Sequence, residues 1–102
     1  MHLKAERLLQ LANRARQLAI GAGAVDAACR KNSACLIFVA ENAGASVNRD
    51  AQRYAEHTCV IWADSQQSLG ALVNRKAVAI LAVLDQHFAA GIKTYFDDDA
   101  CN

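Results

Sequence analysis

Residues 21–42 read GAGAVDAACRKNSACLIFVAEN, and this stretch decides the fold. A glycine-marked turn at Gly21 leads into a short helix that ends near Lys31. An uninterrupted apolar run follows over residues 35–40 and stops at Glu41. Because a strand that is apolar on both faces needs cover on both, this run predicts a sheet between two layers of helices. The start of the helix has small residues, where a backbone can approach an anion closely.

Helical and strand patterns alternate along the rest of the chain. The pattern predicts helices over residues 3–16, 22–31, 48–57, 65–72 and 86–92, and strands over 18–20, 34–40, 58–62 and 77–84. We expect Asn48, Asp64 or Ser65, and Asp85 to cap the helices that follow them. The alternation predicts an α/β protein with a three-layer α/β/α sandwich. We expect both Tyr54 and Trp62 in the core.

Length and composition limit the class of protein. The chain has 102 residues, of which 54% are apolar, and this predicts one globular domain over residues 1–96. Residues 97–102 form an acidic tail in this interpretation, solvated and frayed. No apolar span is long enough to cross a membrane. The first residues have the pattern of an amphipathic helix and not of a signal peptide, so we expect a cytoplasmic protein without a membrane partner.

The residues that could carry catalysis or bind a metal are dispersed. The four cysteines, which share no CxxC or zinc-type spacing, are Cys29, Cys35, Cys59 and Cys101. We expect buried thiols rather than a disulfide framework at the first three, and no metal or cofactor. Cys101 lies in the tail and could oxidise, but nothing in the sequence gives it a role. His57 precedes Cys59 by two residues, but a chance pairing is the preferred interpretation over a catalytic dyad. With no catalytic motif in the chain, the prediction is a protein that is not an enzyme.

Charge is distributed unevenly. The formal net charge is only +1, but residues 1–31 carry six bases against two acids, whereas three acids gather at 97–99. The bases of this first segment are Lys4, Arg7, Arg14, Arg16, Arg30 and Lys31. A modest basic face is compatible with the phosphate backbone of a nucleic acid. A solvated helix face explains the same charges and stays open as the alternative.

Three segments together resemble a known family. They are LLQLANRA at residues 8–15 with Gly21 and Val25 after it, ACLIFVAENA at 34–43, and LG at 69–70 followed by VAILAVLDQHFA at 78–89. In order and spacing they resemble the YlxQ-like bacterial branch of the ribosomal protein L-seven-Ae/L-thirty-e superfamily. The resemblance extends over about residues 8–92. It implies an α/β/α sandwich, which we expect to have a four-stranded mixed sheet.

The resemblance also implies a function and a site. Proteins of this kind bind RNA, often a kink-turn in ribosomal RNA, and are associated with the ribosome or with translation. The positions that would meet the RNA are the turn Gly21, Ala22, Gly23 and Ala24, residue Asn42 after the buried strand, and the loop Asn74, Arg75 and Lys76. The basic clustering adds Arg14, Arg16, Arg30 and Lys31 as phosphate contacts.

This chain departs from the family pattern at the turn itself. Kink-turn binders of the ribosomal branch have an Asn-Glu pair and a lysine there, and these positions read Gly23-Ala24 and Ala27. Backbone amides remain and can contact a phosphate. The alternative is a diverged member of the family that acts through protein–protein contacts or as a homodimer, without binding RNA.

Overall fold

The computed structural model describes residues 1–97, 100 and 101 of the chain. These residues form helices and strands in the following order: α1 (Leu3–Arg14), β1 (Leu18–Ile20), α2 (Ala22–Arg30), β2 (Leu36–Val39), α3 (Ala45–Tyr54), β3 (Val60–Trp62), α4 (Gln66–Leu72), β4 (Ile80–Val83) and α5 (Gln86–Lys93). The alternation of helix and strand predicted from the sequence is therefore confirmed.

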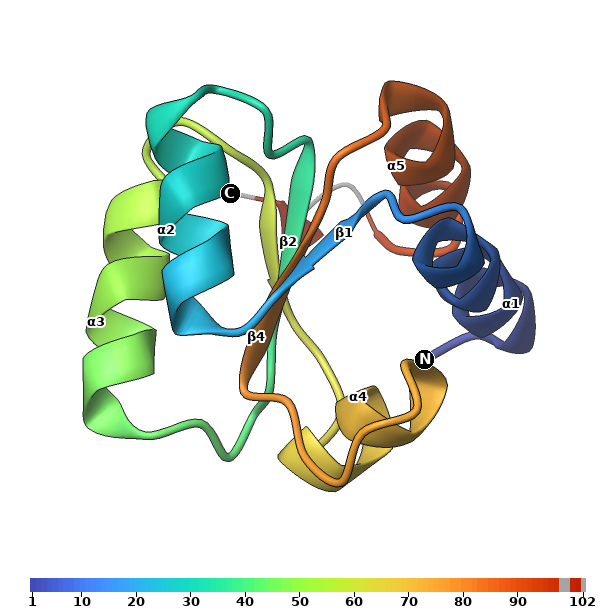
Figure 1. Cartoon of the computed structure of the whole chain (residues 1–102), viewed down its shortest axis with the longest axis horizontal. Helices are drawn as coiled ribbons and strands as arrows, with labels where there is room; N and C mark the ends of the chain where they lie inside the picture. The colour runs from blue at the N-terminus through green and yellow to red at the C-terminus, as the bar shows by residue number, and fades with distance from the viewer. Residues whose placement is uncertain (98–99, 102) are drawn as a thin grey trace.

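The strands make one mixed sheet in the order β1-β4-β2-β3. Strand β4 is antiparallel to both β1 and β2, whereas β2 and β3 are parallel. Helices α2 and α3 pack on one face of the sheet, and α1, α4 and α5 pack on the other (Figure 1). The predicted three-layer sandwich with a four-stranded mixed sheet is confirmed.

The central position of β2 explains its uninterrupted apolar run. All four of its residues are buried. Leu36 and Phe38 point into the core under α1, α4 and α5, whereas Ile37 and Val39 point into the core under α2 and α3. Because successive side chains of a strand alternate between the two faces, a strand covered twice must be apolar at every position.

Three predicted strands were too long. The strands β2, β3 and β4 each occupy only part of the predicted ranges 34–40, 58–62 and 77–84. Ala40 is fully buried although it lies beyond the ladder. An apolar side chain indicates that a residue is buried, and it does not indicate that its backbone pairs with a neighbouring strand. The apolar run therefore extends beyond the residues that pair in the sheet. Helix α1 similarly ends at Arg14 and not at residue 16, because Arg16 has a left-handed backbone with φ 59°.

The start of α3 was predicted wrongly. The helix begins at Ala45 after the N-cap Gly44 and ends at Tyr54, not over residues 48–57. Asn48 lies one turn inside it, where its side-chain amide donates hydrogen bonds to the carbonyl oxygens of Ala43 (2.9 Å) and Gly44 (3.2 Å). Asn48 therefore holds the loop before α3 in place and does not cap the helix. The sequence prediction took it for the N-cap and so placed the start of α3 about one turn too late.

The two other predicted caps are confirmed. The Ser65 hydroxyl accepts the backbone N–H of Ser68 at 3.1 Å, at the start of α4. The Asp85 carboxylate accepts the N–H of Phe88 at 2.9 Å, at the start of α5. These bonds satisfy amides that the first turn of a helix leaves without an internal partner.

The two aromatic residues expected in the core differ. Tyr54 is buried as predicted, with 9% of its surface exposed. Trp62 is not, because it ends the edge strand β3 and is 39% exposed. Its indole N–H donates a 2.8 Å hydrogen bond to the side-chain oxygen of Asn48 in α3.

The prediction of a buried thiol was wrong for Cys59. Cys59 and Cys101 form a disulfide across 42 positions of sequence, a pairing that only the folded chain creates. Cys29 and Cys35 are free and half-buried. The expectation that the tail over 97–102 is solvated and frayed is wrong for Ala100 and Cys101, which pack against the core under α1, α4 and α5. Asp98, Asp99 and Asn102 lie outside the described residues, and the division of the chain after residue 96 stays a prediction. Within the described part of the chain, no helix has the length and apolar content needed to cross a membrane.

Candidate nucleic-acid interface

Three of the predicted RNA-contacting segments meet at one end of the sheet. Gly21 follows β1 and Asn42 follows β2, while the loop with Arg75 precedes β4. Because β4 runs antiparallel to β1 and β2, the end of each of those strands lies beside the start of β4 (Figure 1, lower part). The Gly21 N–H donates to the carbonyl oxygen of Ile80 at 2.9 Å, which ties the Gly21 turn to the first residue of β4. We call this end of the sheet the loop end.

The turn into α2 exposes backbone amides. Gly21 has φ 95°, a conformation that favours glycine, and no side chain makes a capping hydrogen bond to this helix. Residues 22–24 are all exposed. The first amides of a helix have no internal acceptor, and the helix dipole adds positive potential there. The start of α2 therefore has the geometry and polarity to hold a phosphate oxygen.

The loop before β4 carries the positive charges of the loop end. Asn74 adopts φ 62°, which lets the chain reverse after α4. The Arg75 N–H then donates to the carbonyl oxygen of Gly70 at 2.8 Å, and the Val78 N–H donates to that of Gln66 at 2.9 Å. Arg75 and Lys76 are exposed. A loop fastened to α4 at both its ends thus presents two cations.

Asn42 has a structural role at the loop end. Its side-chain oxygen accepts the backbone N–H of Gln66 at 2.9 Å, and the Gln66 side chain donates to the Asn42 carbonyl oxygen at the same distance. A weaker 3.5 Å contact links the Asn42 amide to Gln67. Asn42 therefore fixes the loop after β2 to the start of α4, beside the exposed acid Glu41.

The remaining predicted basic residues lie at the opposite end of the sheet. Arg14 and Arg16 precede the start of β1. Arg30 and Lys31 end α2, which has nine residues and carries them about 13 Å from the Gly21 turn. The structure thus gathers the turn, Asn42 and the 74–76 loop, and separates them from these four cations.

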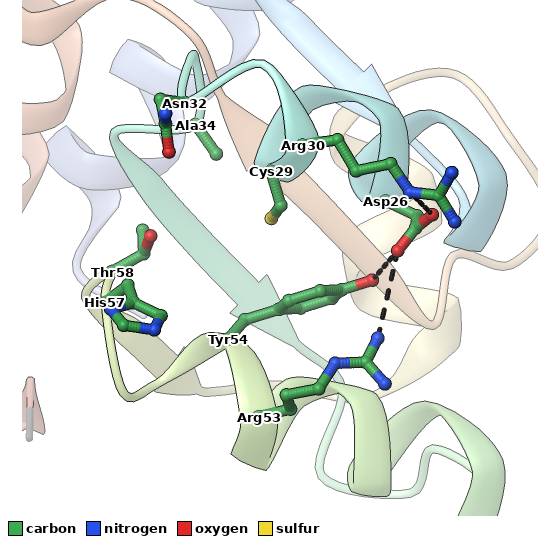
Figure 2. A pocket seen from close by; sticks show the side chains of 9 residues that line it. All are labelled: Asp26, Cys29, Arg30, Asn32, Ala34, Arg53, Tyr54, His57 and Thr58. Atoms are coloured by element: carbon green, nitrogen blue, oxygen red, sulfur yellow. Dashed lines mark hydrogen bonds and ion pairs between the residues drawn. The ribbon is translucent and has the colours of Figure 1, made fainter.

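A groove between α2 and α3 is a feature that the sequence analysis missed (Figure 2). Its volume is about 660 Å³. Its lining residues are Asp26, Cys29, Arg30, Asn32, Ala34, Arg53, Tyr54, His57 and Thr58. The four-residue spacing of Asp26 and Arg30 is the only signal in the sequence, since it predicts an ion pair on one helix. The groove also requires α3 to pack beside α2, and no local sequence pattern indicates which helices lie next to each other.

The Asp26 carboxylate organises one end of this groove. It accepts a hydrogen bond from the Tyr54 hydroxyl at 2.9 Å and forms an ion pair with the Arg30 Nε, also at 2.9 Å. The Arg53 guanidinium lies 3.8 Å away. Burial raises the pKa of Tyr54 to about 12, and the hydrogen bond to Asp26 adds to the shift.

Cys29, which lines the groove with His57, and Cys59, two residues after His57, are unsuited to nucleophilic catalysis. Burial raises the pKa of the Cys29 thiol, with a further contribution from Asp26, so the reactive thiolate is disfavoured. Cys59, the neighbour of His57 in sequence, is bonded to Cys101. Among the residues that the structure describes, no three His, Cys, Asp or Glu side chains gather in a way that could hold a metal ion. The groove is therefore better suited to binding than to covalent chemistry.

Comparisons with known proteins place this fold in context. A family model described as the ribosomal protein L7Ae/L30e/S12e/Gadd45 family matches residues 4–92. Among solved structures, the chain is similar to a protein with unknown function from Bacillus halodurans C, with a TM-score of 0.85 and 24% sequence identity. That similarity covers 91% of this chain and 96% of the other, and it shows the fold. No curated protein sequence matches the chain.

Proposed function

This chain belongs to the ribosomal protein L7Ae/L30e/S12e/Gadd45 family, and from that premise we propose that it binds structured RNA through the loop end, in association with the ribosome or with translation. The observation that carries the proposal is that the α2 start and the Arg75–Lys76 loop lie at the same end of the sheet, after β1 and before β4. One element supplies backbone donors and the other supplies cations. Both are groups that hold phosphate oxygens.

The chemistry of the loop end favours recognition of the RNA backbone over recognition of bases. Gly23 and Ala24 have no side chain that can donate or accept a hydrogen bond, and Ala27 has none either. Nothing prevents a phosphate from approaching the exposed amides of residues 22–24. Contacts of this kind recognise the path of a backbone and carry little sequence information. The proposed ligand is therefore a sharply bent RNA, such as a kink-turn, recognised by its shape.

A titration over several salt concentrations tests the proposal. Three labelled RNAs are compared: a kink-turn, the same strands with the bulge removed, and a kink-turn with substituted sheared G·A pairs. We expect affinity to fall as salt rises, because phosphate contacts release counterions. We expect the bent RNA to bind more tightly than the plain duplex, and the base substitutions to matter only as far as they straighten the RNA. No binding at low salt, or an affinity independent of salt, would contradict RNA binding.

The second candidate function is contact with another protein, including a second copy of the chain, without RNA. A different observation favours it: Leu3 and Leu11, two turns apart on α1, are 58% and 48% exposed. Exposed large aliphatic side chains on one helix are a feature of contact surfaces. Light scattering across a range of protein concentrations measures self-association, and a monomer at every concentration would remove the homodimer.

A further inference from the structure

The groove between α2 and α3 has a polarity of its own, and it lies away from the loop end. Arg30 belongs to the last turn of α2, and Tyr54 ends α3. We propose that this groove binds one nucleotide unit, with its phosphate monoester on Arg30 and Arg53 and its base at the opposite side. The inference stands independently of RNA binding at the loop end, because the two sites use different residues.

The charged side of the groove has capacity for an anion. Arg30 contacts Asp26 through Nε, and Arg53 contacts Asp26 at 3.8 Å and Asp50 at 3.5 Å, both long distances for an ion pair. Each guanidinium has five N–H donors, and these contacts use the Nε of Arg30 and the two terminal nitrogens of Arg53, so they engage only some of the donors. The two arginine side chains are 81% and 60% exposed. The Asp26 carboxylate lies against both guanidiniums, so a phosphate would approach them from the solvent side, where it would gain charge-assisted hydrogen bonds from two helices at once.

The middle of the groove is suited to an uncharged ring. Cys29 and the Tyr54 ring lie between the charged side and the far side, with Ala34 near the far side (Figure 2). The Tyr54 ring is held at its hydroxyl by Asp26. Because that bond already fixes the ring, the binding of a ligand would not have to restrict the Tyr54 side chain, and this entropic cost of binding is avoided. Tyr54 exposes only 9% of its surface, so the apolar contact here is small. Its place beside the charged side favours a ligand with a sugar or base next to its phosphate.

The far side of the groove offers polar groups that can form hydrogen bonds. Asn32, His57 and Thr58 lie there, away from the two arginines (Figure 2). Amide, imidazole and hydroxyl groups both donate and accept hydrogen bonds, as the edge of a nucleobase does. The volume of about 660 Å³ lies within the usual range of roughly 300–1,000 Å³ for small-molecule sites. A side that can bind an anion, an apolar middle and a polar far side together match a nucleotide.

The nucleotide unit has two possible sources that share this chemistry. One is a free 5′-mononucleotide, and the other is the 5′-phosphorylated end of an RNA strand. The test therefore uses the full chain with AMP, GMP, CMP and UMP, with the matching nucleosides, with inorganic phosphate, and with a short oligoribonucleotide carrying either a 5′-phosphate or a 5′-hydroxyl. Binding is followed by NMR shifts of the His57 and Tyr54 side chains and by calorimetry.

We expect at least one nucleotide, free or terminal, to bind more tightly than its nucleoside and than inorganic phosphate. A free nucleotide that binds more tightly than the phosphorylated oligonucleotide identifies the first source, and the reverse order identifies the second. Equal binding of nucleotide and nucleoside would overturn the phosphate site. Equal binding of nucleotide and inorganic phosphate would overturn the nucleotide assignment. The absence of any change in the NMR signals of His57 and Tyr54, with any probe up to about 10 mM, would overturn the phosphate site and the nucleotide assignment together.

Three variants locate the site. Arg30→Gln combined with Arg53→Gln is expected to weaken nucleotide binding by about tenfold or more, because it removes charged donors. Asp26→Asn is expected to strengthen binding, since it removes a competing carboxylate and keeps an acceptor for the Tyr54 hydroxyl. These opposite signs cannot both arise from unfolding. Unchanged affinity in the arginine variant, or weaker binding in Asp26→Asn, would overturn the inference.

The control is Arg75→Gln with Lys76→Gln at the loop end, which is expected to leave mononucleotide binding unchanged. This control also separates the two proposals. If the loop-end variant loses RNA while the groove variant loses nucleotide, both sites exist. If the loop-end variant loses nucleotide binding and the arginine variant keeps it, the groove is not the nucleotide site. That result would not contradict the proposal that RNA binds at the loop end.

Discussion

Gly70 in α4 lies directly against the backbone at Arg75: a β-carbon on Gly70 would be 2.7 Å from the Arg75 carbonyl oxygen and 2.8 Å from the Ala77 nitrogen. Both obstacles are backbone atoms, so neither can rotate out of the way. The Arg75 N–H also donates to the Gly70 carbonyl oxygen at 2.8 Å. The position of the basic loop, and thus of the proposed RNA contacts, depends on the absence of a side chain at residue 70.

We predict that Gly70→Ala lowers the free energy of unfolding by about 1–3 kcal/mol, the usual cost of overpacking. The matched control is Gly23→Ala, also within a helix, where a β-carbon would meet nothing within 4 Å. There we expect no loss, and a gain of up to about 1 kcal/mol from helix propensity. Denaturant unfolding measures both. Equal stability of the two variants would contradict the close approach of Gly70 to the loop.

Removal of the two cations of the loop end tests where RNA is held. Arg75→Gln with Lys76→Gln is expected to weaken RNA binding and to reduce the salt dependence, by about 0.9 in the log–log slope for each phosphate that the protein no longer neutralises. The control, Arg14→Gln with Arg16→Gln, removes the same charge at the opposite end of the sheet. We expect it to keep most of the slope. If both double variants reduce the slope equally, general charge rather than the loop end governs binding.

Much of the fold could be predicted because burial leaves a local trace in sequence. The run around Phe38 predicts a strand covered on both faces, and Ser65 and Asp85 are caps whose type alone suggests their role. The misplaced start of α3 shows the limit of such signals. Asn48 has the side chain of a cap but uses it on the carbonyl oxygens of Ala43 and Gly44, and residue type does not reveal which partner a side chain selects.

The candidate sites depend on relationships that no local pattern contains. Arg16 and Gly21 are close in sequence, but β1 carries the chain from one end of the sheet to the other between them. The groove requires Asp26 and Tyr54 to come from different helices, and the disulfide joins residues 42 positions apart. Strand direction and helix packing determine the separation of Arg16 from Gly21, the groove and the disulfide. The sequence could therefore predict some of the residues involved, but not which of them lie together in the fold.

The Cys59–Cys101 disulfide is expected to contribute to stability. It closes a long stretch of chain, and restriction of the unfolded chain by a loop of that size corresponds to roughly 3–4 kcal/mol in the chain-entropy model. The closed end also keeps Phe96 against Phe38, with ring centroids 5.6 Å apart. We predict that a reductant lowers the melting temperature of the wild-type chain.

The control for this prediction is the variant Cys59→Ala with Cys101→Ala, which should melt at the lower temperature with or without reductant. A variant with Cys35→Ala keeps the disulfide and should respond to reductant as the wild type does, since Cys35 is free. Thiol labelling of the unreduced protein should modify only Cys29 and Cys35. A melting temperature that does not change on reduction would contradict a stabilising role.

The contact between Tyr54 and Asp26 makes stability depend on pH in the alkaline range. Burial, and then the hydrogen bond to Asp26, raises the pKa of Tyr54 from 10.0 to about 12. The folded chain therefore keeps the phenol proton over a range in which the unfolded chain has lost it. The resulting stabilisation is complete below pH 10 and is lost as the pH rises from 10 through about 12.

The ultraviolet absorbance of phenolate checks this prediction. The chain has two tyrosines, so the titration of Tyr54→Phe, subtracted from that of the wild type, isolates Tyr54. We expect the isolated transition near pH 12. Asp26→Asn should move it only part of the way down, because burial is the larger cause and stays in place. A Tyr54 transition at pH 10 in the folded wild type would contradict the buried contact, and a full return to 10 in Asp26→Asn would make Asp26 the main cause.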